Sequence, residues 1–196
     1  MHQNLKIMRS ILFILVLFPV LMFSQAKNCV YDFEEKTDST FVKVMPEKLI
    51  YERVFGNAKD FIQFTLINNN GVPTLFFQLL QKNNGFITAS CLDKKSRIVF
   101  QLANGKIVTL LSATDEVCST LTFNDVAKEN IRILDGYFLF SKDNYEELKK
   151  SPITLMRVQF SSETKDFVIK KEIKSEVLKQ TYTPENYFIN YLHCVE

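Results

Sequence analysis

Alternating apolar and polar residues predict β-strands along much of the chain, and the clearest example lies near its centre. The segment Arg97–Leu111 reads RIVFQLANGKIVTLL, two alternating runs joined by Asn104-Gly105. Asn-Gly favours a two-residue type I′ turn, because both central residues of that turn need a positive φ. The resulting register gives the hairpin one apolar face, with the facing pairs Leu102 and Ile107, Phe100 and Thr109, and Ile98 and Leu111.

Similar runs precede this hairpin and are separated from one another by short polar turns. The expected strands are Phe41–Phe55 with a break at Pro46, Asp60–Ile67, Thr74–Gln81 and Phe86–Leu92. Thr74–Gln81 reads TLFFQLLQ, a nearly continuous apolar run that indicates burial on both faces. Because short polar turns join successive strands, the pattern predicts an antiparallel meander.

The pattern is weaker after Ser112. We expect a helical turn at Asp115–Thr120, short strands at Asn130–Leu134, Tyr137–Phe140 and Ile153–Phe160, and a short helix at Asp143–Lys150. Asp143 is the predicted cap of that helix, with Glu146 at its third position. Asp166–Gln180 fits both the strand and the helix period, so a strand followed by a helix remains one of two interpretations.

A helix at the end of the sequence is the last expected element. Thr183 as cap, Pro184 at the first position and Glu185 in the first turn predict a helix that continues through Cys194. Its apolar stripe, which would pack on the sheet, contains Phe188, Tyr191, Leu192 and Val195. The predicted fold class is therefore mainly β within α+β. It has an antiparallel meander sheet, open or curled into a half-barrel or sandwich, with a short helix and a C-terminal helix packed on it.

Residues 1–26 have the organisation of a cleaved signal peptide. Lys6 and Arg9 precede the apolar run Ile11–Phe23, and Ser24-Gln25-Ala26 places small residues where signal peptidase cuts. The run is shorter than a bilayer span and contains a proline, which argues against an anchor. The Phe-Ser-Gln ending resembles bacterial signal peptides of the Bacteroidota. We therefore expect one exported β-rich domain at 27–196, located in the periplasm or outside the cell.

The four cysteines lie after the predicted leader and are expected to form two disulfides, because exported proteins meet an oxidising environment. Three pairings are possible. We favour Cys29 with Cys194, which ties the two ends together, and Cys91 with Cys118, which joins the sheet to the loop that follows it. No two cysteines have the CxxC spacing of redox-active dithiols or zinc knuckles.

Charge and motifs narrow the functional classes. Without Lys6 and Arg9, 22 of the 24 Lys and Arg residues remain against 22 Asp and Glu, so the mature chain is formally neutral and does not favour nucleic acid. Only His193 would remain of two histidines, beside Cys194, and we expect it to cap or pack the last helix. The paired acids Glu34-Glu35, Asp115-Glu116 and Glu146-Glu147 are expected on solvated surfaces. The lysine-rich stretch 142–179 is expected to form ion pairs with interleaved acids.

The aromatic residues admit two interpretations. Phe76, Phe77, Phe86 and Phe100 fall in expected strands and suit either a packed core or the lining of a ligand cup. Tyr182, Tyr187 and Tyr191 suit either helix packing or a contact surface for a partner.

The leading functional hypothesis is a non-enzymatic interaction or binding module of the cell envelope or secretome, with no cofactor and no metal. Its partner would be an envelope or extracellular protein. In outline the chain is also similar to calycin-like barrels, which implies a carrier of a small hydrophobic ligand, although the Gly-x-Trp motif of lipocalins is absent because the chain contains no Trp. An envelope hydrolase is the third hypothesis, and it would require His193 or two carboxylates to converge in a cleft.

Overall fold

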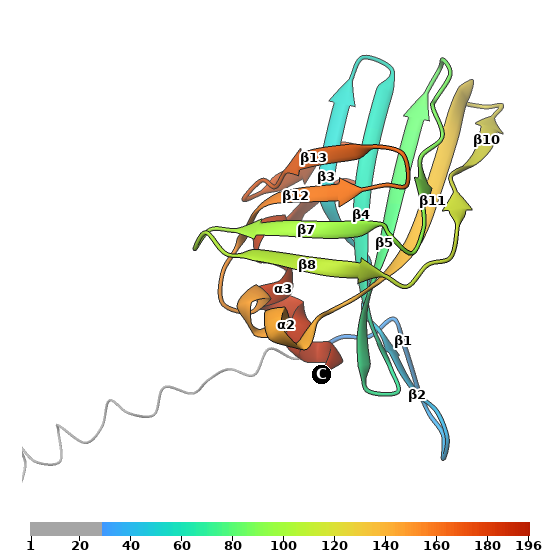
Figure 1. Ribbon diagram of the computed structural model, residues 1–196. Helices are drawn as coiled ribbons and strands as arrows, with labels where there is room; N and C mark the ends of the chain where they lie inside the picture. The colour runs from blue at the N-terminus through green and yellow to red at the C-terminus, as the bar shows by residue number, and fades with distance from the viewer. Residues whose placement is uncertain (1–28) are drawn as a thin grey trace, which may run out of the picture.

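A computed structural model describes residues 29–196, and the predicted signal peptide with its cleavage site lies outside this range. The fold is mostly antiparallel β-sheet with two short helices, as the sequence predicts (Figure 1). The first strands are β1 (Phe33–Lys36), β2 (Phe41–Val44), β3 (Lys48–Phe55), β4 (Ala58–Asn69), β5 (Val72–Asn83), β6 (Cys91–Leu92), β7 (Arg97–Leu102) and β8 (Ile107–Ser112). They are followed by β9 (Val117–Cys118), β10 (Thr120–Asn124), β11 (Glu129–Leu139), α2 (Lys142–Leu148), β12 (Ile153–Gln159), β13 (Thr164–Val168), β14 (Ile173–Ser175) and β15 (Gln180–Tyr182). The C-terminal segment contains η2 (Pro184–Asn186), α3 (Tyr187–Tyr191) and η3 (Leu192–Val195).

Eleven strands form one sheet in the order β1-β2-β4-β5-β11-β8-β7-β12-β13, with β3 also beside β4 and β10 also beside β11. Strands β1 and β13 lie at opposite ends of this order, so the sheet is not closed. The order departs from a simple meander because β11 lies between β5 and β8. Among residues 29–196, no helix has the length and apolar character needed to cross a membrane.

The sheet folds over into two crossed layers. Strands β7, β8, β12 and β13 lie across β3, β4 and β5 (Figure 1). The layers are joined where β11 pairs with β8 at only two positions, Phe138 with Ser112 and Leu139 with Leu111. This short ladder is where the sheet changes direction. Beyond β12 and β13, the far ends of β3, β4 and β5 continue without a second layer (Figure 1).

Aromatic side chains fill the space between the layers. Phe64 of β4 contacts the rings of Phe77, Phe100, Tyr187 and Phe188, with centroids 5.6–6.3 Å apart. All five rings are almost completely buried. Phe77 and Phe100 are therefore core residues, whereas Phe76 is partly exposed and Phe86 is 81% exposed. The volume that a ligand would occupy in a calycin-like cup holds these rings.

The central hairpin forms, but its predicted turn and register are wrong. Ile107 faces Gln101, and Phe100 faces Val108, one position away from the predicted pairing. The loop has three residues, Ala103–Gly105, because the Leu102 amide donates to the Lys106 carbonyl and only Gly105 has a positive φ, +82°. Three-residue loops commonly end in such a left-handed glycine. The shift turns Ile107 and Leu111 outward, where each is about half exposed.

Three other predictions of local structure are wrong. The strand predicted at Phe86–Leu92 is mostly a loop, and only Cys91 and Leu92 form a strand, β6. The helical turn predicted at Asp115–Thr120 is absent, because Val117 and Cys118 form β9, which pairs with β6. The separate strands predicted at Asn130–Leu134 and Tyr137–Phe140 are one strand, β11, which runs through Asp135-Gly136. The structure also has strands at β1 and β10, which the sequence did not suggest. At residues 166–180, where the sequence left strand and helix open, the chain forms the end of β13, β14, a turn and the first residue of β15.

The helices are confirmed with altered boundaries. The predicted helix at Asp143–Lys150 is α2, and it begins one residue earlier with Ser141 at the N-cap. The predicted C-terminal helix is divided into η2, α3 and η3, and the Thr183 side chain makes no capping hydrogen bond. Phe188, Leu192 and Val195 are buried against the sheet as expected.

Candidate functional site

The uncovered ends of β3, β4 and β5 form the floor of a groove of about 490 Å³, which we call the Phe86 groove. Its walls are the loop at Phe86–Thr88 on one side and Lys165–Phe167 of β13 on the other. Its lining consists of Tyr51, Arg53, Ala58, Asp60, Leu79, Gln81, Lys82, Asn83, Phe86, Ile87, Thr88, Lys165, Asp166 and Phe167. The groove lies on the concave face of the sheet, immediately beyond the aromatic core.

A row of polar side chains crosses the groove floor. Arg53 faces Asp60, and Asp60 faces Gln81 across neighbouring strands, so all three project from the same face. The Arg53 Nε lies 3.1 Å from Asp60 Oδ2, and the Gln81 amide donates to Asp60 Oδ1 at 3.0 Å. Because both oxygens of Asp60 are engaged, this carboxylate holds its neighbours in place, while Arg53 remains exposed to solvent.

The Phe86 wall is fixed from the floor. Arg132 of β11, which faces Gln81 of β5, donates to the Ile87 carbonyl at 2.7 Å and to the Ser119 carbonyl at 2.9 Å. Ile87 is buried beneath the loop. Phe86, next to it, is 81% exposed. The ring is exposed at the rim of the groove and is therefore available to contact a ligand there.

The β13 wall is fixed by aromatic packing and an ion pair. Tyr51 packs edge-on against Phe167 with ring centroids 5.0 Å apart. Asp166 forms a two-pronged pair with Arg157 of β12, at 2.6 and 2.7 Å. These hydrogen bonds hold the pKa of the Asp166 carboxyl below its ordinary value. Asp166 is therefore ionised at neutral pH and unsuited to donate a proton.

Two more exposed phenylalanines lie on the concave face at the same end of the sheet. Phe55 faces Ala58 at the tip of β3, and Phe123 of β10 faces Asn130 of β11. They are 79% and 48% exposed. The open end of the concave face thus combines a hydrogen-bonding floor with aromatic rings at its margins.

The three tyrosines proposed as a contact surface are only partly available. Tyr187 is buried among the core rings, and burial raises the pKa of its hydroxyl well above the ordinary value. Tyr187 thus follows the helix-packing alternative and contributes no exposed contact surface. Tyr182 and Tyr191 are partly exposed and border a small pocket of about 110 Å³ beside Lys48.

The cysteines pair as the sequence analysis favoured, Cys29 with Cys194 and Cys91 with Cys118. Two disulfides are compatible with an oxidising, exported environment. His193 Nε2 lies 3.7 Å from the Cys29 sulfur and 3.5 Å from the Cys194 sulfur, close enough for three metal ligands. Metals bind thiolates, however, and both sulfurs are joined in a disulfide, so this cluster does not fit a metal in its oxidised form.

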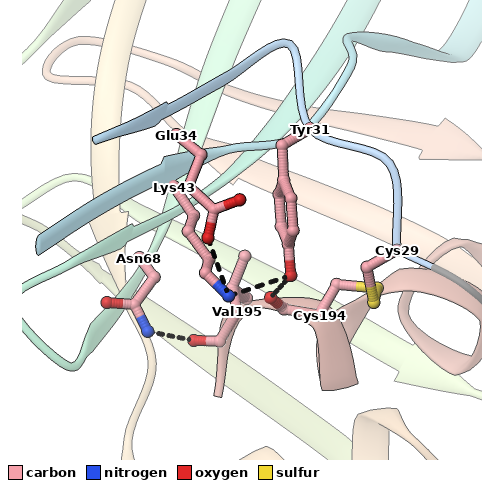
Figure 2. A network of polar contacts seen from close by, with 7 residues as sticks. All are labelled: Cys29, Tyr31, Glu34, Lys43, Asn68, Cys194 and Val195. Atoms are coloured by element: carbon pink, nitrogen blue, oxygen red, sulfur yellow. Dashed lines mark hydrogen bonds and ion pairs between the residues drawn. A yellow bond between two sulfur atoms is a disulfide. The ribbon is translucent and has the colours of Figure 1, made fainter. Parts of the chain in front are cut away.

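A polar network holds the C-terminal segment against the body (Figure 2). The Tyr31 hydroxyl donates to the Cys194 carbonyl at 2.9 Å, and the buried Asn68 amide donates to the Val195 carbonyl at 2.8 Å. Lys43 lies 3.4 Å from both the Tyr31 hydroxyl and Glu34. Together with the Cys29–Cys194 disulfide, these contacts explain why His193 lies at an anchored end rather than in a catalytic cleft.

Several charged residues at the surface, including Lys165 at the rim of the groove, form ion pairs. In the lysine-rich stretch, Lys149 pairs with Glu146 and Glu196, Lys165 with Glu163 and Lys174 with Glu172. The ion-paired surface predicted for this stretch is confirmed at these lysines. Glu34 and Glu35 are exposed on β1, and Asp115 pairs with Lys94. The acids considered for hydrolysis thus lie on separate exposed elements.

Sequence reasoning missed the Phe86 groove. It assigned Phe86 to a strand and treated Asp60 only as the start of an alternating run. One signal was present, because Asp60 has the same strand parity as the core residues Ile62, Phe64 and Leu66. A charged residue whose side chain lies on the same face as the core residues indicates that the strand extends beyond the core at that position. Comparison of the chain with protein-family models, curated proteins and solved structures found no match.

Proposed function

We propose that the protein is an exported, non-enzymatic binding module that holds a neutral oligosaccharide in the Phe86 groove. It would act in the periplasm or outside the cell. The observation that carries the proposal is Phe86, 81% exposed beside a floor of ordered polar side chains. A sugar ring presents an apolar face of C–H groups, which stacks on aromatic rings, and a rim of hydroxyls, which hydrogen-bond to planar polar groups such as those of Arg53 and Gln81.

The position of the groove favours a glycan over an extended peptide. The floor of the groove is a face of the sheet, where the main-chain groups of β4 and β5 pair with strands on both sides. An extended peptide gains its affinity for a sheet mainly through main-chain hydrogen bonds at an edge. A ligand in the groove must instead be recognised by side chains, which suits a sugar chain.

The charges of the groove favour a neutral ligand and binding without hydrolysis. Arg53 is balanced by Asp60, and Lys165 lies 2.7 Å from Glu163. Glycoside hydrolysis needs one carboxylic acid that keeps its proton, whereas Asp166 is held ionised by Arg157 and Asp60 is engaged by two donors. These contacts support a binding role.

The test is titration calorimetry of the oxidised mature protein with β-1,4-linked glucose, xylose, mannose and N-acetylglucosamine tetrasaccharides and an α-1,4-linked glucose tetrasaccharide. We expect one class to bind and Phe86→Ala to weaken it at least tenfold, because the ring forms the exposed wall. Phe33→Ala is the control, since Phe33 is another exposed phenylalanine, at 51%, but lies on β1. Failure of all five sugars to bind, or equal losses in the two variants, would contradict the proposal.

A further inference from the structure

The edges of the sheet differ in charge. Strand β1 carries Glu34, Glu35 and Lys36, and β13 carries Lys165 and Asp166. The outer part of β3 carries Glu52 and Arg53, and Glu52 also accepts a hydrogen bond from Ser175 of β14. Charged side chains of this kind keep an edge from pairing with another chain. Strand β10 has the sequence TLTFN, with no charged residue, proline or glycine.

The main chain of β10 is paired on one side only. Its five residues face Glu129–Ile133 of β11, and within residues 29–196 no other strand pairs with it. It forms the outermost strand at that side of the sheet (Figure 1). Its side chains are also unpacked, since Leu121 is 50% and Phe123 is 48% exposed. An uncharged, extended edge with exposed apolar side chains is a ready template for another strand.

We propose that β10 accepts an extended, uncharged peptide segment of a partner protein as an added strand. Main-chain hydrogen bonds would provide the affinity, and the alternation of β10 would select the side chains. Leu121 and Phe123 face Arg132 and Asn130 on the concave side, whereas Thr120 and Thr122 face Ile133 and Ile131 on the opposite side. The segment that fits has apolar residues on the concave side and small β-branched residues on the other.

The size of the edge argues against a second copy as the occupant. A five-residue strand is about 17 Å long, and pairing along it buries a few hundred Å² on each partner. Stable protein complexes bury about 1,200–2,000 Å² in total. A rigid second copy would therefore need further contacts, whereas a flexible segment can also wrap over Phe123 and Leu121 and gain area there.

This proposal is independent of the glycan proposal, because β10 contributes none of the residues that line the Phe86 groove. A protein that binds sugar but no peptide, or peptide but no sugar, would separate the two.

The test is amide hydrogen exchange of the oxidised mature protein, read by NMR at Thr120–Asn124. The probe is an uncharged peptide with blocked ends and the sequence Gln-Thr-Val-Thr-Val-Thr-Gln, compared with the same peptide methylated on all of its main-chain amide nitrogens. We expect the outward amides of β10 to exchange rapidly in the free protein and at least tenfold more slowly with the first peptide. The methylated peptide should have no effect, because it cannot donate main-chain hydrogen bonds.

Two variants sharpen the result. Phe123→Lys places a charge on this edge and should abolish the protection, whereas Phe33→Lys on the already charged β1 should leave it unchanged. Both side chains are about half exposed, so the chain should fold in either case. Protection confined to another edge or to the Phe86 groove would overturn the proposal. So would protection that grows with protein concentration when no peptide is added, since that would identify a second copy as the occupant.

Discussion

At the scale of single residues, the molecule uses polar side chains on a face that is otherwise apolar. Asp60 follows the parity of Ile62 and Phe64, yet it lies beyond the second layer, where Arg53 and Gln81 satisfy its oxygens. A charged side chain is tolerated at position 60 because the core between the two layers does not extend to this part of β4. The same face therefore serves the core at one end and the Phe86 groove at the other.

Gly136, in the middle of β11, is a position where the packing leaves no space for a side chain. A Cβ at this position would collide with the Leu92 side chain. We expect Gly136→Ala to lower the free energy of unfolding by about 1–3 kcal/mol, the usual range for overpacking. Urea denaturation would measure the loss. Gly85→Ala is the control, because the closest atom to its added Cβ is the Asn83 Oδ1 at 3.8 Å, and an effect as large there would refute this explanation.

At the scale of elements, the C-terminal segment shows how short helices are held in place without strong capping. The N-caps of η2, α3 and η3 make no side-chain hydrogen bond. Their stability comes instead from the burial of Phe188, Leu192 and Val195 and from tethers to β4 and to the chain around Cys29. Tertiary packing thus maintains helices that are too short to persist alone.

Asn68 is the buried side chain that tethers the C-terminal segment to β4. Its amide donates to the Val195 carbonyl and its oxygen accepts from the Gly71 amide, both at 2.8 Å. Asn68→Ala should cost about 2 kcal/mol or more of stability, because it leaves two main-chain groups without partners. It should also speed hydrogen exchange across α3 and η3. Asn69→Ala, one residue away with an exposed side chain, should change neither property.

The same elements show what a sequence can predict. Strand existence follows from alternation, so β4, β5, β7, β8 and β12 are recovered at nearly their observed bounds. Register depends on the loop, and Asn104-Gly105 fits a two-residue and a three-residue loop equally well. The exposure of Phe86 could not be predicted from the neighbouring sequence. It depends on β11 lying between β5 and β8 and on the hydrogen bond from Arg132 to the Ile87 carbonyl. Long-range pairing of this kind leaves no periodic signal in the sequence.

At the scale of the whole molecule, the two layers divide the concave face into a packed half and an open half. The packed half is filled by the aromatic core, so we expect recognition at the open half and at the edges. Crossing of the layers also brings β13 beside β3, which share no main-chain pairing but meet through Tyr51 and Phe167. The Phe86 groove is thus a product of the tertiary fold.

We expect the sugar affinity of the Phe86 groove to lack the bell-shaped pH dependence that is typical of a hydrolase. No histidine is among its lining residues, and the pKa of Asp166 is held below its ordinary value by Arg157. A lowered carboxyl pKa stabilises the fold above the unfolded-state pKa of about 4, and this contribution is lost as the pH falls through the folded-state pKa. Sugar affinity should therefore be constant from about pH 5 to 8 and decline only in stronger acid. Calorimetry across this range would check it, and a bell-shaped profile would contradict it.

The Cys29–Cys194 disulfide has a mechanical consequence. The two residues are 165 positions apart in sequence, yet their Cα atoms are 5.6 Å apart. Tension applied to the chain before Cys29 and after Cys194 would pass through the sulfur–sulfur bond and bypass the sheet. Under oxidising conditions the folded body between them carries no load and cannot be drawn out by its ends.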